Sequence, residues 1–384
     1  MQWNRLVRIV LGLMTITAIV AGCAGTKETG APASTAPRAD HKPVLFYAKG
    51  GSLYVSDPAG TPGRKLTDGP GDFQPAPSPD GRRLAFVRKV PESGPATPCT
   101  NNGGELWVLD LAADGAPASD PRRLVDPAAL AALDNGGNTG GCTHIDSPRW
   151  SPTGDRIAFL NSGGKAGFLL TAAAATGVVQ APSRPLYASK EYSWAPDGKR
   201  IAWVRGRYDV SPGDVAVLNV VDGMSQPVAT GTNAVSVAYA DDGRSVLFAN
   251  GDVTGSQFSR YGFTLPIGGI YSVEPPAAAR PVFTGMGAYD DVAPLRGGDI
   301  GFTQWSPDQR TKSIQVVNPG GVPRTVADTS TAPSPAWADD SVAFIGTAEE
   351  RPLLIATDRT PPNGNQNNEP QQVDVGVDAF AWSN

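Results

Sequence analysis

The chain has 384 residues, with 37 acidic and 32 basic side chains, a formal charge of −5, two histidines and three cysteines. This balance lacks the basic excess of nucleic-acid-binding proteins, so we expect no nucleic-acid partner. Two histidines exclude a zinc site built from several imidazoles. The sequence also lacks a recognisable cofactor motif and a Gly-x-Ser-x-Gly nucleophile motif, so we expect no cofactor and assign no catalytic residue.

The first residues have the pattern of an export signal. Arg5 and Arg8 precede an apolar run over residues 9–20. Such a run is typical of a signal peptide and is too short to cross a hydrocarbon core of about 30 Å. The sequence Val20-Ala21-Gly22-Cys23 resembles the lipobox of bacterial lipoproteins, which implies that Cys23 is acylated and becomes the first mature residue. The alternative is an uncleaved anchor or an ordinary secretory signal in which Cys23 has no role.

The next residues are rich in Ala, Thr, Pro and Gly and cannot bury a core, so we expect a flexible tether. The chain is therefore divided into a signal peptide at 1–22, a lipid-anchored linker at 23–42 and a folded domain at 43–384. The expected location is the extracytoplasmic side of the cell membrane, where lipid chains hold the protein.

The folded domain is built on a repeat with a period of about 44 residues. In each copy, a Pro-Asp-Gly or related turn joins two short apolar segments. Pro fixes φ, Asp bonds to its own backbone and Gly accepts positive φ, so the turn should pair its flanking segments as a hairpin. The clearest copies are PSPDGRRLAFV from Pro77, WSPTGDRIAFL from Trp150, WAPDGKRIAWV from Trp194 and YADDGRSVLFA from Tyr239.

Two further strands follow each hairpin, as at 105–110 and 122–125 after the hairpin from Pro77. A repeat of roughly 40 to 50 residues made of short strands is typical of a β-propeller. Residues 378–382 have the pattern of an innermost strand without a successor, and residues 44–47 that of a second strand without a predecessor. We expect the two to pair in one blade, because this would close the ring and remove exposed sheet edges. The prediction is an all-β, closed propeller of seven four-stranded blades, with six or eight blades as the alternatives.

The Trp-Ser-Pro-Asp-Gly hairpins resemble those of the TolB-like, or PD40, branch of the WD40-like propellers. The resemblance covers roughly residues 43–384 and implies the propeller fold. TolB carries an α/β domain before its propeller, whereas about twenty low-complexity residues precede the first blade here. Similar propellers also form the gating domain of prolyl oligopeptidase-like enzymes.

The recurring aromatic residue that opens each hairpin has two interpretations. Its fixed place in the repeat favours packing between adjacent blades, and stacking on a ligand is the alternative. The residues concerned are Trp150, Trp194, Tyr239, Trp337 and Trp382.

Two cysteines remain if Cys23 is acylated. Cys99 and Cys142 both lie in the unusually long second unit, and export to an oxidising compartment favours a disulfide between them. Closing this loop would stabilise the fold by roughly 4 kcal/mol in the chain-entropy model. A metal-binding or redox pair is the alternative.

Carboxylates recur three to five positions before the hairpin aromatic or its equivalent. In a propeller these positions lie near one mouth of the central channel, so the carboxylates could form a rim that binds a cation, a basic peptide or a cationic partner. The alternative is that each Asp caps the turn that enters its strand. Whether the rim holds a metal is left open by the sequence. The residues are Asp72, Asp146, Glu191, Asp290, Asp291 and Asp378.

These features together favour a monomeric, membrane-tethered propeller that binds an envelope protein or peptide and performs no chemistry. The alternative is an enzyme in the channel mouth, such as a metal-assisted hydrolase or lyase that uses the carboxylates. An enzyme would need acid, base and substrate-positioning groups that converge in one pocket. A binding scaffold would need an exposed patch with charged or aromatic anchors.

Overall fold

The computed structural model describes parts of the unit that runs from Pro37 to Asn384. Regular structure in these parts is antiparallel sheet, apart from the short helix α1 (Pro127–Ala132) and the 3₁₀ turn η1 (Arg296–Gly298). The described residues are 43–57, 59–69, 71–89, 104–133, 144–162, 167–183, 188–205, 213–250, 267–306, 310–338, 341–357 and 369–383.

Strands β1 to β11 form three four-stranded sheets, the first of which is completed by β27 from the end of the chain. The first contains β27 (Ala379–Trp382), β1 (Leu45–Lys49), β2 (Ser52–Ser56) and β3 (Arg64–Lys65). The second contains β4 (Asp72–Pro77), β5 (Arg83–Lys89), β6 (Gly104–Asp110) and β7 (Arg122–Arg123). The third contains β8 (Ile145–Trp150), β9 (Arg156–Ser162), β10 (Gly167–Ala173) and β11 (Val179–Gln180).

A seven-stranded sheet follows, and two more four-stranded sheets complete the described fold. The seven-stranded sheet contains β12 (Ala188–Trp194), β13 (Arg200–Arg205), β14 (Gly213–Asn219), β15 (Ser225–Tyr239), β16 (Val246–Asn250), β17 (Ile267–Val273) and β18 (Arg280–Met286). The next contains β19 (Tyr289–Pro294), β20 (Ile300–Trp305), β21 (Thr311–Val317) and β22 (Arg324–Ser330). The last contains β23 (Ala336–Ala338), β24 (Ser341–Ile345), β25 (Pro352–Thr357) and β26 (Gln371–Val375).

The strand β15 explains why one sheet has seven strands. Its first part pairs with β14 and its second part pairs with β16. Between them, Gly231 and Asn233 have φ values of +67° and +50°, which turn the chain without ending the strand. We therefore treat this sheet as two four-stranded units that share β15, and we number the strands of every unit first to fourth from the inside outwards.

The first and last described strands lie in the same sheet. β27 pairs with β1 in the antiparallel register Leu45↔Trp382 to Ala48↔Ala379. The backbone N–H of Ser383 donates to the carbonyl oxygen of Val44 at 2.9 Å, and the N–H of Val44 donates to the Ser383 hydroxyl at 3.0 Å. The two ends of the domain therefore meet in one unit.

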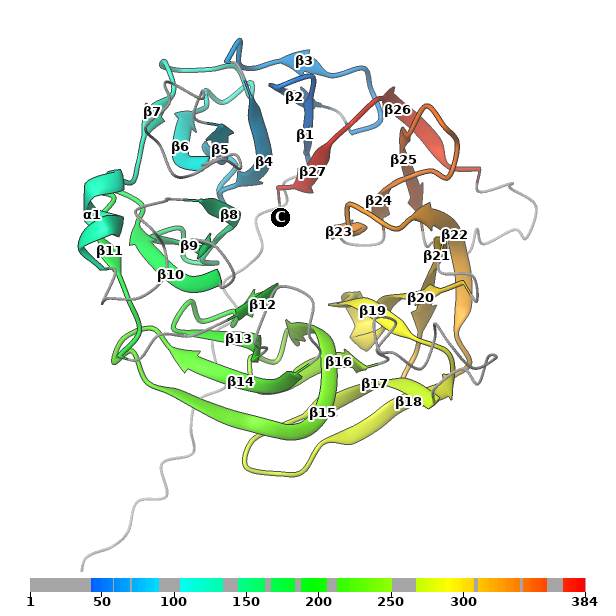
Figure 1. Cartoon of the computed structure of the whole chain (residues 1–384). Coiled ribbons are helices and arrows are strands. Elements are labelled where there is room, and N and C mark those ends of the chain that lie inside the picture. Colours follow the sequence, from blue (N-terminus) through cyan, green and yellow to red (C-terminus); the bar gives the residue numbers. More distant parts are fainter. Residues whose placement is uncertain are drawn as a thin grey trace, which may run out of the picture. The chain divides into compact units, whose positions relative to one another are not determined.

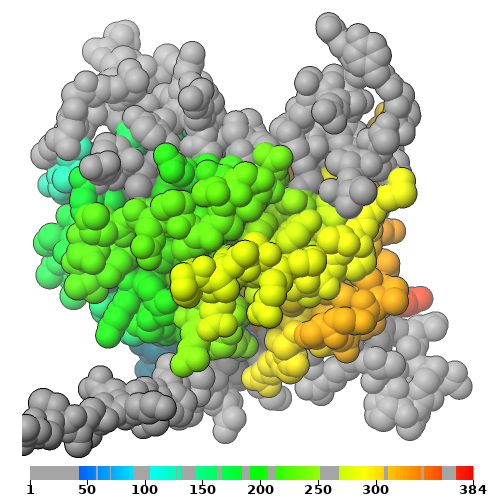
Figure 2. Space-filling view, turned by 90° about the horizontal axis from the view of Figure 1, so that it is seen from below, coloured from blue at the N-terminus to red at the C-terminus, as the bar shows by residue number. Residues whose placement is uncertain are grey.

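The sheets follow one another in chain order around a common centre (Figure 1). The strands β4, β8, β12, β19, β23 and β27 lie nearest this centre, and β3, β7, β11, β18, β22 and β26 lie at the periphery. Figure 2 shows the outer side of the molecule, where the green surface of the 200–240 region adjoins the yellow surface of the 270–300 region without a break. The hydrophobic core lies between adjacent sheets, as where Val108 of β6 packs with Phe159 of β9.

The Pro-Asp-Gly turns behave as their chemistry predicts. Asp80 accepts hydrogen bonds from the Ser78 hydroxyl at 2.6 Å and the Arg82 backbone N–H at 3.1 Å, and Gly81 has a φ of +65°. Successive turns also touch, because Arg83 Nη2 donates to the carbonyl oxygen of Gly154 at 2.9 Å. The equivalent bond further along joins Arg200 to Gly243 at 2.7 Å. The first-to-second turns of neighbouring units therefore lie at the same end of the fold.

The hairpin aromatics pack between units. Trp150, Trp194, Tyr239 and Trp382 are each less than 9% exposed. Each of the three tryptophans donates its indole N–H to a carbonyl of the preceding unit's first strand, at Ala76, Arg149 and Ala336 respectively, over 2.8 to 3.1 Å. The packing interpretation is confirmed for these residues. Trp337 packs over Gly301, where a Cβ atom would lie 2.6 Å from the indole ring.

Candidate functional site

Three of the first strands, β4, β8 and β19, share a bulge that the repeat alone did not reveal. Gln74, Ser147 and Asp291 stand three positions before the hairpin aromatic or its equivalent, and they have φ values of +50°, +53° and +51°. The pairing register with the second strand shifts at each of them. Positive φ is uncommon outside glycine, and a bulge changes the direction of a side chain. The bulges thus concentrate polar side chains along the inner strands.

Asp146 is part of a polar contact between two units. Gln74 of β4 donates from Nε2 to Asp146 Oδ1 at 2.6 Å, and its Oε1 accepts the backbone N–H of Ser147 at 2.9 Å. The Ser147 hydroxyl donates to the same carboxylate oxygen at 2.9 Å. Asp146 is only 7% exposed, so its carboxylate is held within the interface between β4 and β8.

Tyr192 and Arg149 continue this contact into the next unit. The hydroxyl of Tyr192 donates to the carbonyl oxygens of Ser147 and, at 3.0 Å, Ala158. The Arg149 guanidinium lies 4.6 Å from the centroid of the Tyr192 ring and donates to the Tyr192 carbonyl. Burial raises the pKa of the Tyr192 hydroxyl, against the lowering effect of Arg149, so the phenol stays neutral.

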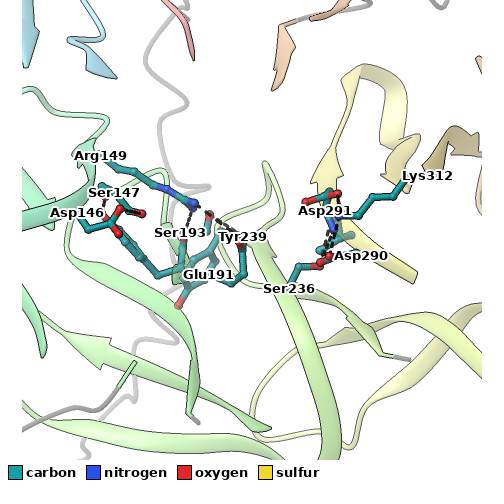
Figure 3. Close-up of polar contacts among 12 residues, drawn as sticks. Asp146, Ser147, Arg149, Glu191, Ser193, Ser236, Tyr239, Asp290, Asp291 and Lys312 are labelled. Atoms are coloured by element: carbon teal, nitrogen blue, oxygen red, sulfur yellow. Dashed lines mark hydrogen bonds and ion pairs between the residues drawn. The ribbon is translucent and has the colours of Figure 1, made fainter. Parts of the chain in front are cut away.

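Glu191 has a pKa that its surroundings raise to near neutral pH. Its Oε2 lies 4.0 Å from Arg149 Nη2, and the two side chains are 30% and 41% exposed (Figure 3). Burial raises the pKa of Glu191 to about 7, with Arg149 acting to lower it and Asp290 and Asp291 acting to raise it. This carboxyl therefore exchanges a proton close to physiological pH.

A buried ion cluster lies on the other side of the view in Figure 3, in the unit that starts with β19. Lys312 Nζ lies 2.7 Å from Asp291 Oδ2 and 3.0 Å from Asp290 Oδ2, and the Lys312 and Asp291 side chains are each 3% exposed. Thr303 donates to Asp291 Oδ2 at 2.7 Å. Burial acts to lower the pKa of Lys312, but Asp291 and Asp290 raise it overall, so the ammonium stays charged. Burial and Asp291 raise the pKa of Asp290 despite Lys312.

Asp72 and Asp378 occupy opposite environments. The Asp72 side chain is fully buried, and Arg88 holds both of its oxygens, with Nε to Oδ1 at 2.6 Å and Nη2 to Oδ2 at 2.9 Å. This is a bidentate, charge-assisted pair. The Arg88 guanidinium also lies 4.4 Å from the Trp107 ring centroid. Asp378 is exposed, and its backbone N–H donates to the Ala48 carbonyl at 2.9 Å just before β27 begins.

The structure thus separates the six predicted rim residues into three groups. Asp72, Asp290 and Asp291 are paired with a cation of their own unit, and Asp146 is bonded across an interface. Glu191 and Asp378 keep exposed surface. Asp290 also accepts the N–H of Asp291 at 2.9 Å, which is the local capping that the sequence offered as the alternative. Ligand binding by these residues stays a prediction.

Three cations of this site were not identified from the sequence, although two of them carried a signal. Arg88 lies directly opposite Asp72 in the hairpin register, which the Pro-Asp-Gly turn defines. Lys312 occupies a buried position in the alternating strand Thr311–Val317, and a lysine in such a position needs an anionic partner. Arg149 precedes Trp150 and shows no comparable pattern.

Within the described stretches, no group of three or more His, Cys, Asp or Glu side chains is arranged to hold a metal ion. The described part of the chain also holds no helix with the length and hydrophobicity of a membrane span. The predicted lipidation site Cys23 and the predicted disulfide between Cys99 and Cys142 lie outside the described residues.

Comparison with known proteins places the chain by its fold. No protein-family model matches it, and no curated protein matches it. It is similar to the periplasmic gluconolactonase of Pseudomonas aeruginosa, with a TM-score of 0.54 and 15% identity over 88% of this chain and 98% of that one. It is also similar to the β-propeller domain of the Trilobed protease from Pyrococcus furiosus, with a TM-score of 0.52 and 12% identity over 86% and 94% of the two chains. TolB from Acinetobacter baumannii aligns with a TM-score of 0.49 and 17% identity over 79% and 67%.

The fold is a β-propeller. This conclusion comes from the two similarities with a TM-score above 0.5, together with the antiparallel four-stranded units. The all-β propeller predicted from the repeat is therefore confirmed. At 12% and 15% identity, these similarities concern the fold alone.

Proposed function

We propose that this chain is a lipid-anchored, extracytoplasmic β-propeller that binds a protein or peptide of the cell envelope and catalyses no reaction. The export signal and the small residues before Cys23 support the anchor. The domain would act as a monomer, since a propeller buries its own sheet edges within each ring.

We further propose that the propeller is closed and has seven blades. The pairing of β27 with β1 supports closure, because it places the two ends of the domain in one sheet. The division of the seven-stranded sheet at Gly231 and Asn233 supports the blade number.

The observation that carries the binding function is the way in which the inner carboxylates are held. Arg88 engages both oxygens of Asp72, Lys312 lies between Asp290 and Asp291, and Gln74 fixes Asp146. These carboxylates are engaged by neighbouring side chains and three of them are buried, whereas an acid or base in catalysis must reach its substrate within hydrogen-bond distance. The arrangement therefore supports recognition more than chemistry.

The proposed recognition surface is formed by Glu191, Arg149 and Asp378, which keep exposed surface beside the first strands. A surface with two carboxyl groups and one guanidinium suits a polar peptide segment with a basic residue. The pKa of Glu191 is raised to about 7, so the carboxyl becomes charged as the pH rises through this value. Binding of a cationic partner should therefore strengthen over the same range.

An affinity capture tests this function. The full-length protein serves as bait for solubilised envelope proteins, beside a variant with Glu191→Gln and Asp378→Asn. Asp241→Asn is the matched control, because Asp241 is an exposed carboxylate in the turn between β15 and β16. We expect one defined protein on the wild type and the control and its loss from the double variant. Equal capture by all three proteins would show that Glu191 and Asp378 do not form the recognition surface.

One observation favours the enzyme alternative. A carboxyl with a pKa of about 7 next to a guanidinium is a common arrangement for a general acid or base. The alternative function is therefore a hydrolase or lyase reaction at the inner strands with Glu191 as the proton-transfer group. A reaction found in a substrate screen and abolished by Glu191→Gln, with the fold intact by circular dichroism, would replace the binding function.

A further inference from the structure

The two ends of the propeller differ in what they expose. In an antiparallel unit, the turn from the first to the second strand and the turn from the third to the fourth strand lie at the same end. Hydrogen bonds between the two kinds of turn agree with this. In the turn after β14, the N–H of Val220 donates to the carbonyl of Lys199, in the turn before β13, at 3.0 Å. In the unit before it, the N–H of Ala174 donates to the carbonyl of Asp155 at 2.8 Å. We call this end the entry end.

The polypeptide enters the domain at the entry end. β1 is the second strand of its unit, so its start lies where a first-to-second turn would lie, beside the end of β27. The bonds between Val44 and Ser383 fix this point. The linker at 23–42 therefore joins the domain at the same end as the turns.

Exposed apolar side chains gather at the entry end. The described residues include five large hydrophobic side chains that are prominently exposed. Four of them lie in third-to-fourth turns of the entry end, and Met286 lies at the opposite end, where β18 leads to β19. The four are Val178 (61% exposed), Val221 (72%), Met224 (60%) and Val322 (88%).

These turns are ordered, so the exposure is a property of the fold. In the turn after β14, Asn219 N–H donates to the Met224 carbonyl and Gly223 N–H donates to the Asn219 carbonyl, both at 2.9 Å. The Asp222 carboxylate accepts the N–H of Met224 at 2.8 Å. Holding apolar side chains in water on a rigid turn is unfavourable, and groups of them mark a contact surface.

We propose that the entry end rests on the bilayer, with the apolar turn tips at Val178, Val221, Met224 and Val322 in the interfacial layer of the membrane. This inference rests on the lipid anchor of the proposed function. A random-coil tether of about 20 residues would have an end-to-end distance of about 25 Å, which would keep the entry end nearer to the bilayer than the opposite end. The four residues sit on three turns of three units, with Val221 and Met224 on the same turn, and a planar lipid surface can meet all three turns at once.

The orientation also assigns the two ends different roles. Asp378 directly precedes β27 and so lies at the end opposite to the turns, and Glu191 lies at the middle of β12. With the entry end on the membrane, Asp378 faces away from the bilayer and stays accessible to a partner. The same arrangement thus positions the recognition surface.

Site-specific fluorescence tests the orientation. The full-length lipidated protein is incorporated into vesicles of phosphatidylcholine and phosphatidylglycerol at 3:1, with an environment-sensitive fluorophore attached to Cys introduced by Val221→Cys. Met286→Cys is the matched control, because Met286 is similarly exposed, at 66%, but lies at the opposite end. Lipids brominated in the upper acyl chain report contact with the bilayer by quenching.

We expect a blue shift and at least twofold quenching for the label at 221, and neither for the label at 286. A label at 221 that stays in water while the vesicles still carry the protein would overturn the orientation and leave the anchor intact. Quenching at 286 and not at 221 would reverse the orientation. Protein that does not float with the vesicles would refute the anchor, and the orientation with it.

Discussion

Glu191 shows how a single side chain can couple the fold to pH. Its pKa of about 7 lies above its ordinary value, so the folded protein binds more protons than the unfolded chain between about pH 4.5 and pH 7. Linkage then requires that the Glu191 contribution to stability falls as the pH rises through this range.

The corresponding prediction concerns Glu191→Gln. The variant should gain stability relative to the wild type between pH 5 and pH 8, on the order of 1 to 2 kcal/mol after allowance for the partly exposed side chain. Urea unfolding at both pH values measures the difference. A constant gap between the two proteins across this range would show that Glu191 titrates normally.

Lys312 gives a second prediction at this scale. Lys312→Met should destabilise the fold by about 3 to 5 kcal/mol, because it leaves Asp290 and Asp291 buried without a cation. Adding Asp290→Asn and Asp291→Asn to the same chain should restore much of the loss. If the triple variant is no more stable than Lys312→Met in chemical denaturation, the cost comes from lost packing and not from unpaired charge.

Some of these residues could be predicted and others could not. The Asp72–Arg88 pair follows from the hairpin register, because the turn at Asp80 and Gly81 is determined by local chemistry. The left-handed backbone at Gln74 and Ser147 could not be predicted, since non-glycine residues adopt it only where packing imposes it. The sequence therefore located the carboxylates but not the bulges that direct them.

At the scale of elements, several third-to-fourth turns contact the fourth strand of the preceding unit or the residues next to it. Gly177 makes the closest approach, because a Cβ atom there would lie 1.8 Å from the Leu124 carbonyl oxygen. Gly115 approaches Arg64 and Gly223 approaches Ser183 in the same way. The sequence analysis made no prediction about these turns, and this contact between units depends on the assembled fold.

Gly177→Ala tests the contact, and Gly81→Ala is its control. Both glycines have positive φ, at +72° and +65°, but a Cβ at Gly81 meets nothing within 4 Å. The control should cost about 1 to 2 kcal/mol for backbone strain alone. Gly177→Ala should cost at least about 1 to 3 kcal/mol more, because the units must separate. Equal midpoints in thermal unfolding would show that the Leu124 segment simply moves aside.

At the scale of the whole molecule, the ends of the domain are the point at which a propeller opens. Removing residues 379–384 deletes β27 together with the buried Trp382, whose indole N–H bonds to Ala336 at 3.0 Å. We expect this truncation to broaden the unfolding transition, lower its midpoint and promote aggregation, because β1 becomes an unpaired edge. Removal of Asn384 alone is the control. A truncated protein that unfolds as cooperatively as the full chain, at the same midpoint, would argue against closure through β27.

The repeat predicted the propeller because its signal is local and recurs. The path of the chain between units could not be predicted from the repeat. Strand β15 is the example, because it continues from one unit into the next through a bend at Gly231 and Asn233. The end at which the chain enters the domain could not be predicted either. It depends on bringing Val44 next to Ser383, residues that are 339 positions apart.

The lipid anchor supports both the proposed function and the proposed orientation, so its test is the most direct. The measurement is metabolic labelling with a clickable fatty acid, followed by membrane fractionation, for the wild type and Cys23→Ala. The wild type should carry the label and sediment with membranes, and Cys23→Ala should lose the label and keep the longer, unprocessed N-terminus. An unlabelled wild type, or a Cys23→Ala protein processed and released like an ordinary secreted protein with no change in membrane association, would contradict the account.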